Sequence, residues 1–168
     1  MDLKVILGPN GSGKSLYAED LAVASGDSRL YIATMIPQNQ ENRQRIEKHR
    51  LQRRGKGFLT IEEPLCMSCI PVPGDSVVLL EDVSNLVANR IFGTHPGTYR
   101  PILEDILTLA GRCKTLIAVS ISGMNADEYD GETAEYIRAL NELNEQLISH
   151  ASLALEMRDG VPAMLSIQ

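Results

Sequence analysis

A glycine-rich octapeptide near the N-terminus constrains this chain more than any other feature of its 168 residues. Residues 8–15 read GPNGSGKS and match the pattern G-x-x-x-x-G-K-[ST]. In such a loop the glycines let backbone N–H groups converge on a phosphate chain, the lysine reaches the terminal phosphates, and the last hydroxyl can bind Mg²⁺. An apolar strand, Leu3 to Gly8, enters the loop, and a helical pattern from Lys14 to Ala24 leaves it. The sequence therefore predicts a site for a nucleoside triphosphate.

The metal side of this site needs an acidic residue at the end of a neighbouring strand. Glu81 and Asp82 close the apolar run VVLLED at 77–82, which is typical of a strand buried on both faces. Ser15 and Glu81 are therefore the predicted Mg²⁺-binding residues. The alternative is that the two carboxylates only cap a helix that starts near Ser84. Nucleotide contacts are expected from Glu81 and from the whole loop: Gly8, Pro9, Asn10, Gly11, Ser12, Gly13, Lys14 and Ser15.

Strand and helix patterns alternate along the rest of the chain. Further strands are expected at residues 30–33, 58–64 and 115–120, and helices at 39–53, 84–92, 102–113 and 133–150. The chain ends with LALEM, an Asp-Gly pair and AMLSI, which together favour an antiparallel hairpin. This order predicts one domain over residues 1–168 with a P-loop NTPase (RecA-like) α/β fold. Its three layers would contain a mainly parallel sheet and a C-terminal antiparallel hairpin.

Composition excludes several classes of protein. No apolar run approaches the roughly 20 residues of a membrane helix, and the N-terminus lacks the pattern of a signal peptide. The net charge of −6 disfavours nucleic acid as a partner, because a polyanion demands a basic face. Three cysteines, an odd number, indicate a reducing cytoplasm rather than a disulfide framework. Cys66 and Cys69 form an isolated C-x-x-C without the further ligands of a zinc site or the helix start of a redox motif, so neither function is assigned.

Three more motifs follow the phosphate loop in a fixed order. They are YIAT at 31–34, R-I-x-x-H-R-x-x-R at 45–53 and F-x-T-I-E-E-P at 58–64. With them the chain resembles the adenosylcobinamide kinase / adenosylcobinamide-phosphate guanylyltransferase family, and the likeness continues through Leu79-Leu80-Glu81 and Asn89. The resemblance implies GTP- or ATP-dependent phosphorylation of adenosylcobinamide. It also implies transfer of GMP from GTP to the phosphorylated corrinoid, in cobalamin biosynthesis or salvage.

The same resemblance implies roles for single residues. His49 would attack the α-phosphate of GTP, expel pyrophosphate and carry GMP as a phosphoramidate, with Lys14 as the second catalytic residue. The family tends to form homo-oligomers, so a homo-oligomer is expected here. Family motif positions add predicted nucleotide contacts at Ala33, Thr34, Met35, Arg50, Leu51, Gln52, Arg53 and Glu62.

The charge around His49 agrees with this role. Seven of the sixteen Lys and Arg residues lie between Arg43 and Lys56, opposed only by Glu47. Neighbouring cations lower the pKa of an imidazole and keep it neutral, which a nucleophile requires. They would also neutralise the triphosphate and the leaving pyrophosphate. The alternative is a surface histidine on a solvated basic helix.

Some positions depart from the family pattern. Pro9 and Gly11 replace a glycine and an arginine of the family's loop, and Phe58 replaces a tryptophan. Residues 120–125 replace a family segment that carries Asn and Glu. A second hypothesis is therefore a P-loop kinase or regulatory nucleotide-binding protein that lacks the guanylyltransferase step. The absence of an N-K-x-D motif leaves the choice between GTP and ATP open.

Overall fold

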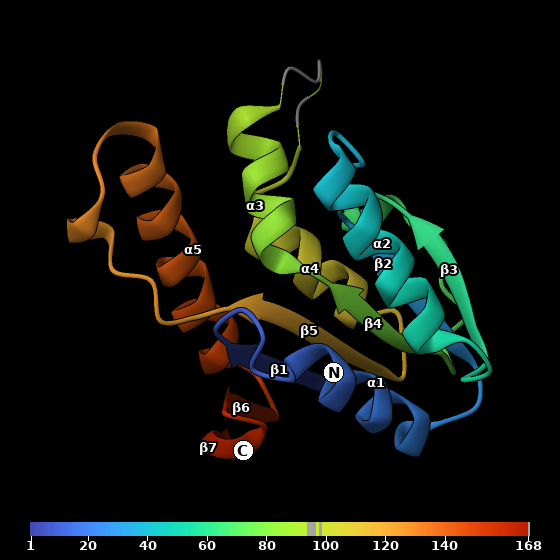
Figure 1. The fold of residues 1–168 in the computed structure, drawn as a ribbon. Coiled ribbons are helices and arrows are strands. Elements are labelled where there is room, and N and C mark those ends of the chain that lie inside the picture. Colours follow the sequence, from blue (N-terminus) through green and yellow to red (C-terminus); the bar gives the residue numbers. More distant parts are fainter. Residues whose placement is uncertain (94–96, 98, 168) are drawn as a thin grey trace.

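The computed structural model describes residues 1–93, 97 and 99–167. The strands of this part are β1 (Leu3–Gly8), β2 (Arg29–Ala33), β3 (Phe58–Glu62), β4 (Val77–Glu81), β5 (Thr115–Ile121), β6 (Leu153–Arg158) and β7 (Val161–Ile167). The helices are α1 (Lys14–Ser25), α2 (Gln40–Arg53), α3 (Val83–Phe92), α4 (Ile102–Ala110) and α5 (Gly131–His150), with 3₁₀ turns η1 (Met67–Cys69) and η2 (Ala126–Glu128). Figure 1 shows their arrangement.

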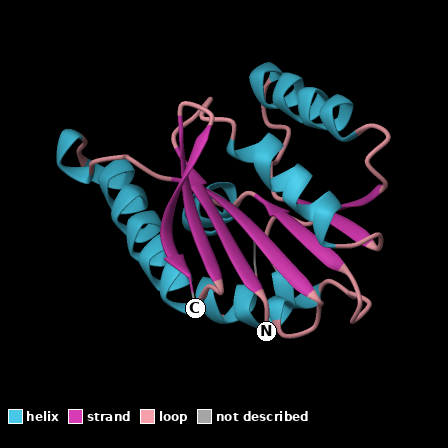
Figure 2. Ribbon diagram, turned by 90° about the horizontal axis from the view of Figure 1, so that it is seen from below, coloured by secondary structure: helices cyan, strands magenta, loops and turns pink. Residues whose placement is uncertain are grey.

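All these strands form one seven-stranded sheet in the order β3-β2-β4-β5-β1-β6-β7. The first six strands pair in parallel, and β7 pairs antiparallel with β6. Helices lie on both sides of the sheet (Figure 2). The predicted three-layer, mainly parallel α/β fold with a C-terminal hairpin is confirmed. None of the helices in the described ranges combines the length and the apolar character that a membrane crossing requires.

The position of strand β4 between two layers of helices explains why its sequence is a continuous apolar run. Val78 and Leu80 belong to the apolar cluster that includes residues of α3, α4 and α5, whereas Val77 and Leu79 belong to the cluster that includes α1. All four side chains are fully buried. A strand covered by helices on both faces has no solvent side, so it shows no alternation of polar residues.

Helix α4 ends earlier than the sequence pattern predicts. The expected helix reached Cys113, but the regular helix stops at Ala110. Gly111 caps it by donating its N–H to the Leu107 carbonyl, and the Arg112 N–H bonds to Leu109. This tight turn leads directly into β5 at Thr115. Cys113 therefore lies after the end of the helix, where it packs in the apolar core.

Cys66 and Cys69 form a disulfide in the turn before β4, whereas Cys113 is free and buried. The expectation that the cysteines form no disulfide is wrong for this pair. The reason is local: turn η1 brings the two Cα atoms to 5.4 Å, which a disulfide can span. Sequence spacing alone did not show that a 3₁₀ turn would form between Pro64 and Pro71 and bring the two cysteines together.

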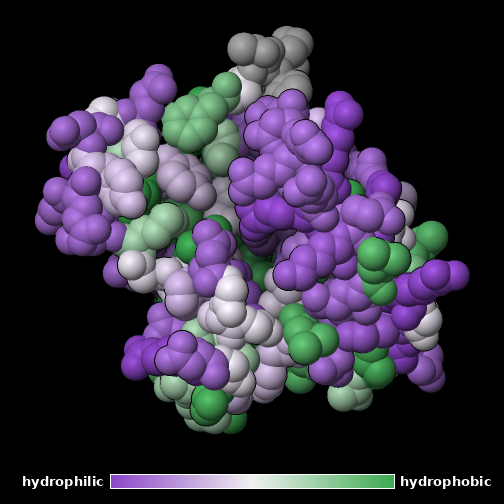
Figure 3. Space-filling view, viewed as in Figure 1, coloured by the Kyte–Doolittle hydropathy of each residue, from purple (hydrophilic) through white to green (hydrophobic). Residues whose placement is uncertain are grey.

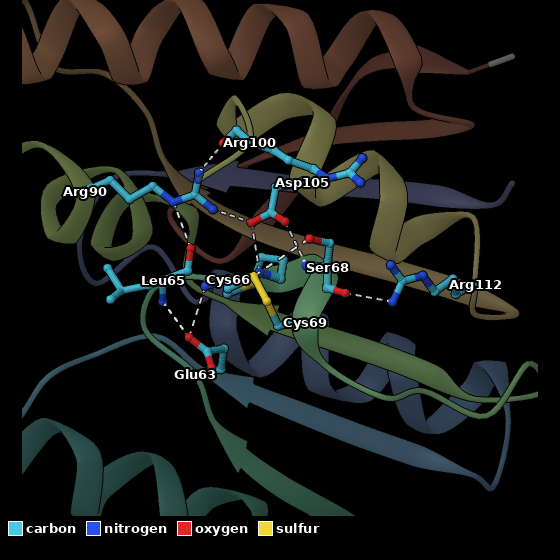
Figure 4. The surroundings of a disulfide bond; sticks show 10 residues. Glu63, Leu65, Cys66, Ser68, Cys69, Arg90, Arg100, Asp105 and Arg112 are labelled. Carbon is cyan, nitrogen blue, oxygen red and sulfur yellow. Dashed lines mark hydrogen bonds and ion pairs between the residues drawn. A yellow bond between two sulfur atoms is a disulfide. The ribbon is translucent and has the colours of Figure 1, made fainter. Parts of the chain in front are cut away.

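Asp105 of α4 fixes this turn (Figure 4). Its carboxylate accepts the N–H groups of Met67 and Ser68, both at 2.8 Å, and pairs with the guanidinium of Arg90. Arg90 in turn donates to the Leu65 carbonyl at 2.8 Å. Asp105 is 1% exposed, so its carboxylate is shielded from water. The network attaches the disulfide segment to α3 and α4.

We predict that Asp105→Ala lowers the free energy of unfolding by about 3 kcal/mol, because it leaves two backbone N–H groups without partners and a buried arginine without its counter-charge. Urea denaturation followed by circular dichroism measures the change. Glu104→Ala removes an exposed carboxylate from the same first turn and serves as the control. An Asp105 variant as stable as the Glu104 variant would contradict the role given to this network.

Candidate nucleotide-binding site

The phosphate loop lies at the carboxyl end of β1, where β2 and β4 also end. Because these strands run parallel, their last residues share one edge of the sheet, and Ala33 of β2 is in register with Glu81 of β4. Gly8 has no room for a side chain, since a Cβ there would lie 2.5 Å from Ser12 Oγ and 2.9 Å from the Met157 carbonyl. Gly13 precedes α1 in the left-handed region (φ 86°).

Lys14 folds back over this loop. Its Nζ donates to the Pro9 carbonyl at 3.1 Å, and the residue is 7% exposed. Burial lowers the pKa of Lys14, while the carboxylates of Asp82 and Glu81 act in the opposite direction. A phosphate chain in the loop offers this ammonium a stronger partner than a single carbonyl. The loop is therefore built to bind an anion.

The two carboxylates after β4 have different partners. Asp82 accepts Ser84 Oγ at 2.6 Å and the Asn85 N–H at 2.7 Å, so it caps α3. Glu81 instead accepts a hydrogen bond from Ser15 Oγ across the loop. Burial raises the pKa of Glu81 to about 7, and the bond from Ser15 opposes the rise. The capping alternative thus holds for Asp82, whereas Glu81 contacts the phosphate loop.

Helix α2 carries His49 to the same place. Asn39 caps the start of the helix, and its side chain accepts the Asn42 N–H at 2.8 Å. His49 Nδ1 lies 3.6 Å from Glu81 Oε1, and the imidazole is 22% exposed. Burial, followed by the positive charges of Arg53 and Arg45, lowers the pKa of His49. A lowered pKa favours the neutral ring, which is the form of an imidazole that can act as a nucleophile.

Two adjoining hollows surround His49, and most of the predicted residues line one or both. The first is lined by Lys14, Ser15, Ala33, Met35, His49, Arg50, Arg53, Glu62 and Glu81. The second follows the loop and includes Asn10, Gly11, Ser12, Gly13, Lys14, Ser15, His49 and Gln52. Hydrophilic side chains gather over α2 in the space-filling view (Figure 3).

A few predicted residues lie elsewhere. Thr34 is fully buried, and its hydroxyl bonds to the Asp82 carbonyl at 2.8 Å and the Asp82 N–H at 2.7 Å. Leu51 is 60% exposed and is not among the lining residues. Gly8 and Pro9 contribute backbone to the loop without lining either hollow. Thr34 therefore supports the end of β4 rather than the hollow itself.

Several lining residues were not predicted. Tyr31, Arg45, Ile46, Thr60, Asp82 and Asn85 also line the first hollow. Arg45 lies within the basic run and in the R-I-x-x-H motif, so the sequence held a signal for it. Tyr31 is fixed by Arg53, whose guanidinium lies 3.3 Å above the ring centroid. That contact, between residues 22 positions apart, could not be read from local patterns.

A sequence model of the family described as "Cobinamide kinase / cobinamide phosphate guanyltransferase" matches residues 4–165. A comparison with curated protein sequences gave no match. Among solved structures, the ATPase domain of a helicase is similar with TM-score 0.52 and 9% identity over 92% of this chain and 68% of that one. A prototypical ATPase of a type III secretion system gives TM-score 0.50 and 10% identity over 97% of this chain and 56% of that one. At such identities these two likenesses show the P-loop ATPase fold alone.

We predict that Lys14→Ala weakens binding of GTP by about 1.5–3 kcal/mol, or roughly 10- to 150-fold, because it removes a charged donor to the phosphates. Isothermal titration calorimetry with GTP and Mg²⁺ measures the change. Lys114→Ala is the matched control, since Lys114 precedes β5 at the amino ends of the parallel strands, away from the phosphate loop. Its side chain donates to the Ser25 carbonyl. Equal affinities of the two variants for GTP would contradict the assignment of the phosphate loop to the binding site.

Proposed function

Because the chain belongs to the cobinamide kinase / cobinamide phosphate guanyltransferase family, we propose that it carries out both reactions of that family through the site around His49. It would phosphorylate adenosylcobinamide with GTP or ATP. It would then transfer GMP from GTP to adenosylcobinamide-phosphate, with the guanylyl group carried on His49. The corrinoid is the acceptor in both steps, and the reactions would take place in the cytoplasm as part of cobalamin biosynthesis or salvage.

One observation carries this proposal: a half-buried histidine faces a phosphate loop. His49 lines both hollows, and its Nδ1 lies 3.6 Å from the carboxylate that Ser15 contacts. A kinase that only transfers a γ-phosphate has no step for a nucleophilic imidazole. A nucleotidyl transfer through a covalent intermediate does require one.

The residues around this histidine support the guanylyl step. A lone pair of the neutral ring forms a bond to the α-phosphorus of GTP, the bond to the bridging oxygen breaks, and pyrophosphate leaves with the electron pair. Arg53 can stabilise the charge that develops, because its Nη1 is buried and has no hydrogen-bond partner in the described structure. Lys14 and the loop N–H groups would bind the β- and γ-phosphates. The acceptor phosphate of the corrinoid then displaces His49 and takes GMP.

The residues present fit a magnesium ion. Ser15 and Glu81 already touch, and Glu81 Oε2 is buried without a hydrogen-bond partner among the described residues. A hydroxyl and a carboxylate are oxygen ligands of the kind that Mg²⁺ takes beside phosphates. We propose that Ser15 binds the ion directly and that Glu81 holds it or its water. When bound, the ion supplies charge neutralisation and orientation of the phosphates.

A second candidate function is a P-loop kinase or regulatory nucleotide-binding protein without the guanylyl step. The segment 120–125 favours it, since it has no Glu, and its one Asn, Asn125, stands at its last position and not at its start as in the family pattern. In the fold this segment adjoins the loop, because the Ser122 N–H bonds to the Gly8 carbonyl at 3.2 Å. A carboxylate is nevertheless present there, as Glu156 of β6 accepts Ser122 Oγ at 2.8 Å. Labelling of His49 separates the two functions.

We predict that Glu81→Ala reduces affinity for GTP about tenfold in Mg²⁺ and less than about twofold in EDTA, because Glu81 acts through the metal. Paired titrations with and without Mg²⁺ measure both values. Glu81→Gln keeps the shape of the side chain and separates loss of charge from loss of packing. An equal loss of affinity in EDTA and in Mg²⁺ would show that Glu81 acts without the ion.

We predict that GTP radiolabelled at the α-phosphate leaves a covalent label on the protein, whereas label at the γ-phosphate is not retained on the histidine. A phosphoramidate resists alkali and is lost in acid, so the stability of the label identifies the bond. His49→Ala should abolish labelling and spare GTP binding, because Lys14, Ser15 and the loop N–H groups carry the phosphate contacts. His150→Ala, which removes an exposed histidine at the end of α5, is the control.

Absence of any label on a protein that binds GTP with Mg²⁺ would exclude the guanylyl step and favour the second candidate. Labelling without a corrinoid product would restrict the loss to the acceptor side, where segment 120–125 departs from the family. Addition of adenosylcobinamide-phosphate to the labelled protein distinguishes these results, since a competent enzyme releases the label as product.

A further inference from the structure

A fully buried carboxylate beside His49 has no part in the proposal above. Glu19 lies on α1, one helical turn beyond Ser15, and is 0% exposed. Its Oε2 accepts Lys56 Nζ at 2.9 Å, but its Oε1 is buried without a hydrogen-bond partner among the described residues. An unsatisfied buried carboxylate oxygen is costly, so a position that keeps one calls for an explanation.

Glu19 belongs to a cluster of three side chains from three elements. One ligand atom each from Glu19, His49 and Glu81 lie within 4.8 Å of one another. His49 Nδ1 and Glu81 Oε2 are likewise buried and unpartnered in the described structure. The cluster thus joins α1, α2 and β4 around the imidazole. Positive charge already surrounds it, because Lys56 contacts Glu19, and Arg45 and Arg53 act on His49.

The two nitrogens of the His49 ring differ in their surroundings. Nδ1 is the buried one and points at Glu81 Oε1, 3.6 Å away. Since the side chain remains 22% exposed, the opposite edge, which carries Nε2, is open to the hollow. In a neutral imidazole one nitrogen holds the proton and the other has the lone pair. A carboxylate beside Nδ1 selects the tautomer with the proton on Nδ1.

We propose that Glu19, together with Glu81, holds His49 as its Nδ1–H tautomer, so that Nε2 is the atom that receives the guanylyl group. Glu19 is a positioning residue in this scheme, because it acts on the ring and not on GTP. Ser15 and the proposed Mg²⁺ compete for Glu81, which leaves Glu19 as the carboxylate reserved for the histidine. The inference rests on the proposed function for the transfer step, although the tautomer itself does not depend on it.

The Nδ1 proton stays in place throughout the proposed transfer. The Nε2 lone pair forms the bond to the α-phosphorus, the bond to the β-bridging oxygen breaks, and pyrophosphate takes its electron pair. The proton stays on Nδ1, where the neighbouring carboxylates stabilise the positive charge that the ring acquires. When the corrinoid phosphate attacks, the Nε2–P bond breaks and the ring returns to the same neutral tautomer. No other proton donor or acceptor is needed.

The first test uses the wild-type protein with ¹⁵N-labelled histidine. Long-range ¹H–¹⁵N correlation spectra report which ring nitrogen of His49 is protonated, and a His49→Gln spectrum assigns the signals. We expect the Nδ1–H tautomer, both in EDTA and in Mg²⁺. After reaction with GTP, ¹⁵N–³¹P coupling identifies the nitrogen bonded to phosphorus, which we expect to be Nε2. An Nε2–H tautomer, or GMP on Nδ1, overturns the proposal.

The second test separates Glu19 from a merely structural ion pair. Glu19→Gln keeps the shape and a hydrogen-bond acceptor for Lys56, but it should lower the rate of labelling at saturating GTP at least about tenfold, with GTP affinity unchanged. It should also raise the population of the Nε2–H tautomer. Asp20→Asn is the matched control, because Asp20 is the next residue, is exposed and contacts the same Lys56 at 3.0 Å.

The outcomes distinguish this inference from the proposed function. A Glu19→Gln protein that labels like Asp20→Asn, with an unchanged tautomer, removes Glu19 from its role. If Glu19→Gln does not fold, the wild-type tautomer and the site of GMP attachment still decide. A wild type that binds GTP and shows the Nδ1–H tautomer but never labels would refute the guanylyl step and leave the positioning of His49 intact.

Discussion

The carboxylate of Glu81 is the contact on which the arrangement of this site depends. It lies at the end of a fully buried strand, receives the hydroxyl of Ser15 from the phosphate loop, and faces Nδ1 of His49 from α2. Thr34 fixes the backbone directly after it through two hydrogen bonds to Asp82. A rigid strand thus sets the distance between the groups that bind the phosphates and the group that would attack them.

Helix α2 is held differently from the other helices. Arg53 is its one buried residue, and it stacks on Tyr31 of β2. Within the helix, Arg50 pairs with Glu62 of β3 at 2.7 Å. Just beyond the helix, Lys56 contacts Glu19 and Asp20 of α1. The element that carries the histidine therefore rests on charged and cation–π contacts and hardly on apolar packing. Its basic composition is needed both for docking and for an anionic ligand.

The fold could be predicted because its signals are local: a glycine loop between a strand and a helix, apolar runs for β4 and β5, and a turn pair between β6 and β7. What escaped prediction depends on long-range contacts or on side-chain direction. Thr34 stands in a recognisable motif, yet its side chain turns toward Asp82 and away from the hollow. Leu51 and Gln52 are consecutive residues of one helix, so their side chains face different sides. Only Gln52 lines the hollow beside the loop. Glu19 looks like an ordinary exposed helix residue until Lys56 is seen beside it.

The ionic attachment of α2 has a thermodynamic consequence. An apolar helix gains its stability from the core whether or not a ligand is present, but α2 gains much of its own from charges that a bound polyphosphate would also satisfy. Ligand affinity and the local opening free energy of this helix are then linked quantities, so that each measures the other. Ligand binding would therefore stabilise α2 directly. Amide exchange along residues 40–53 would slow as the site fills with ligand, while that of β4 would not change.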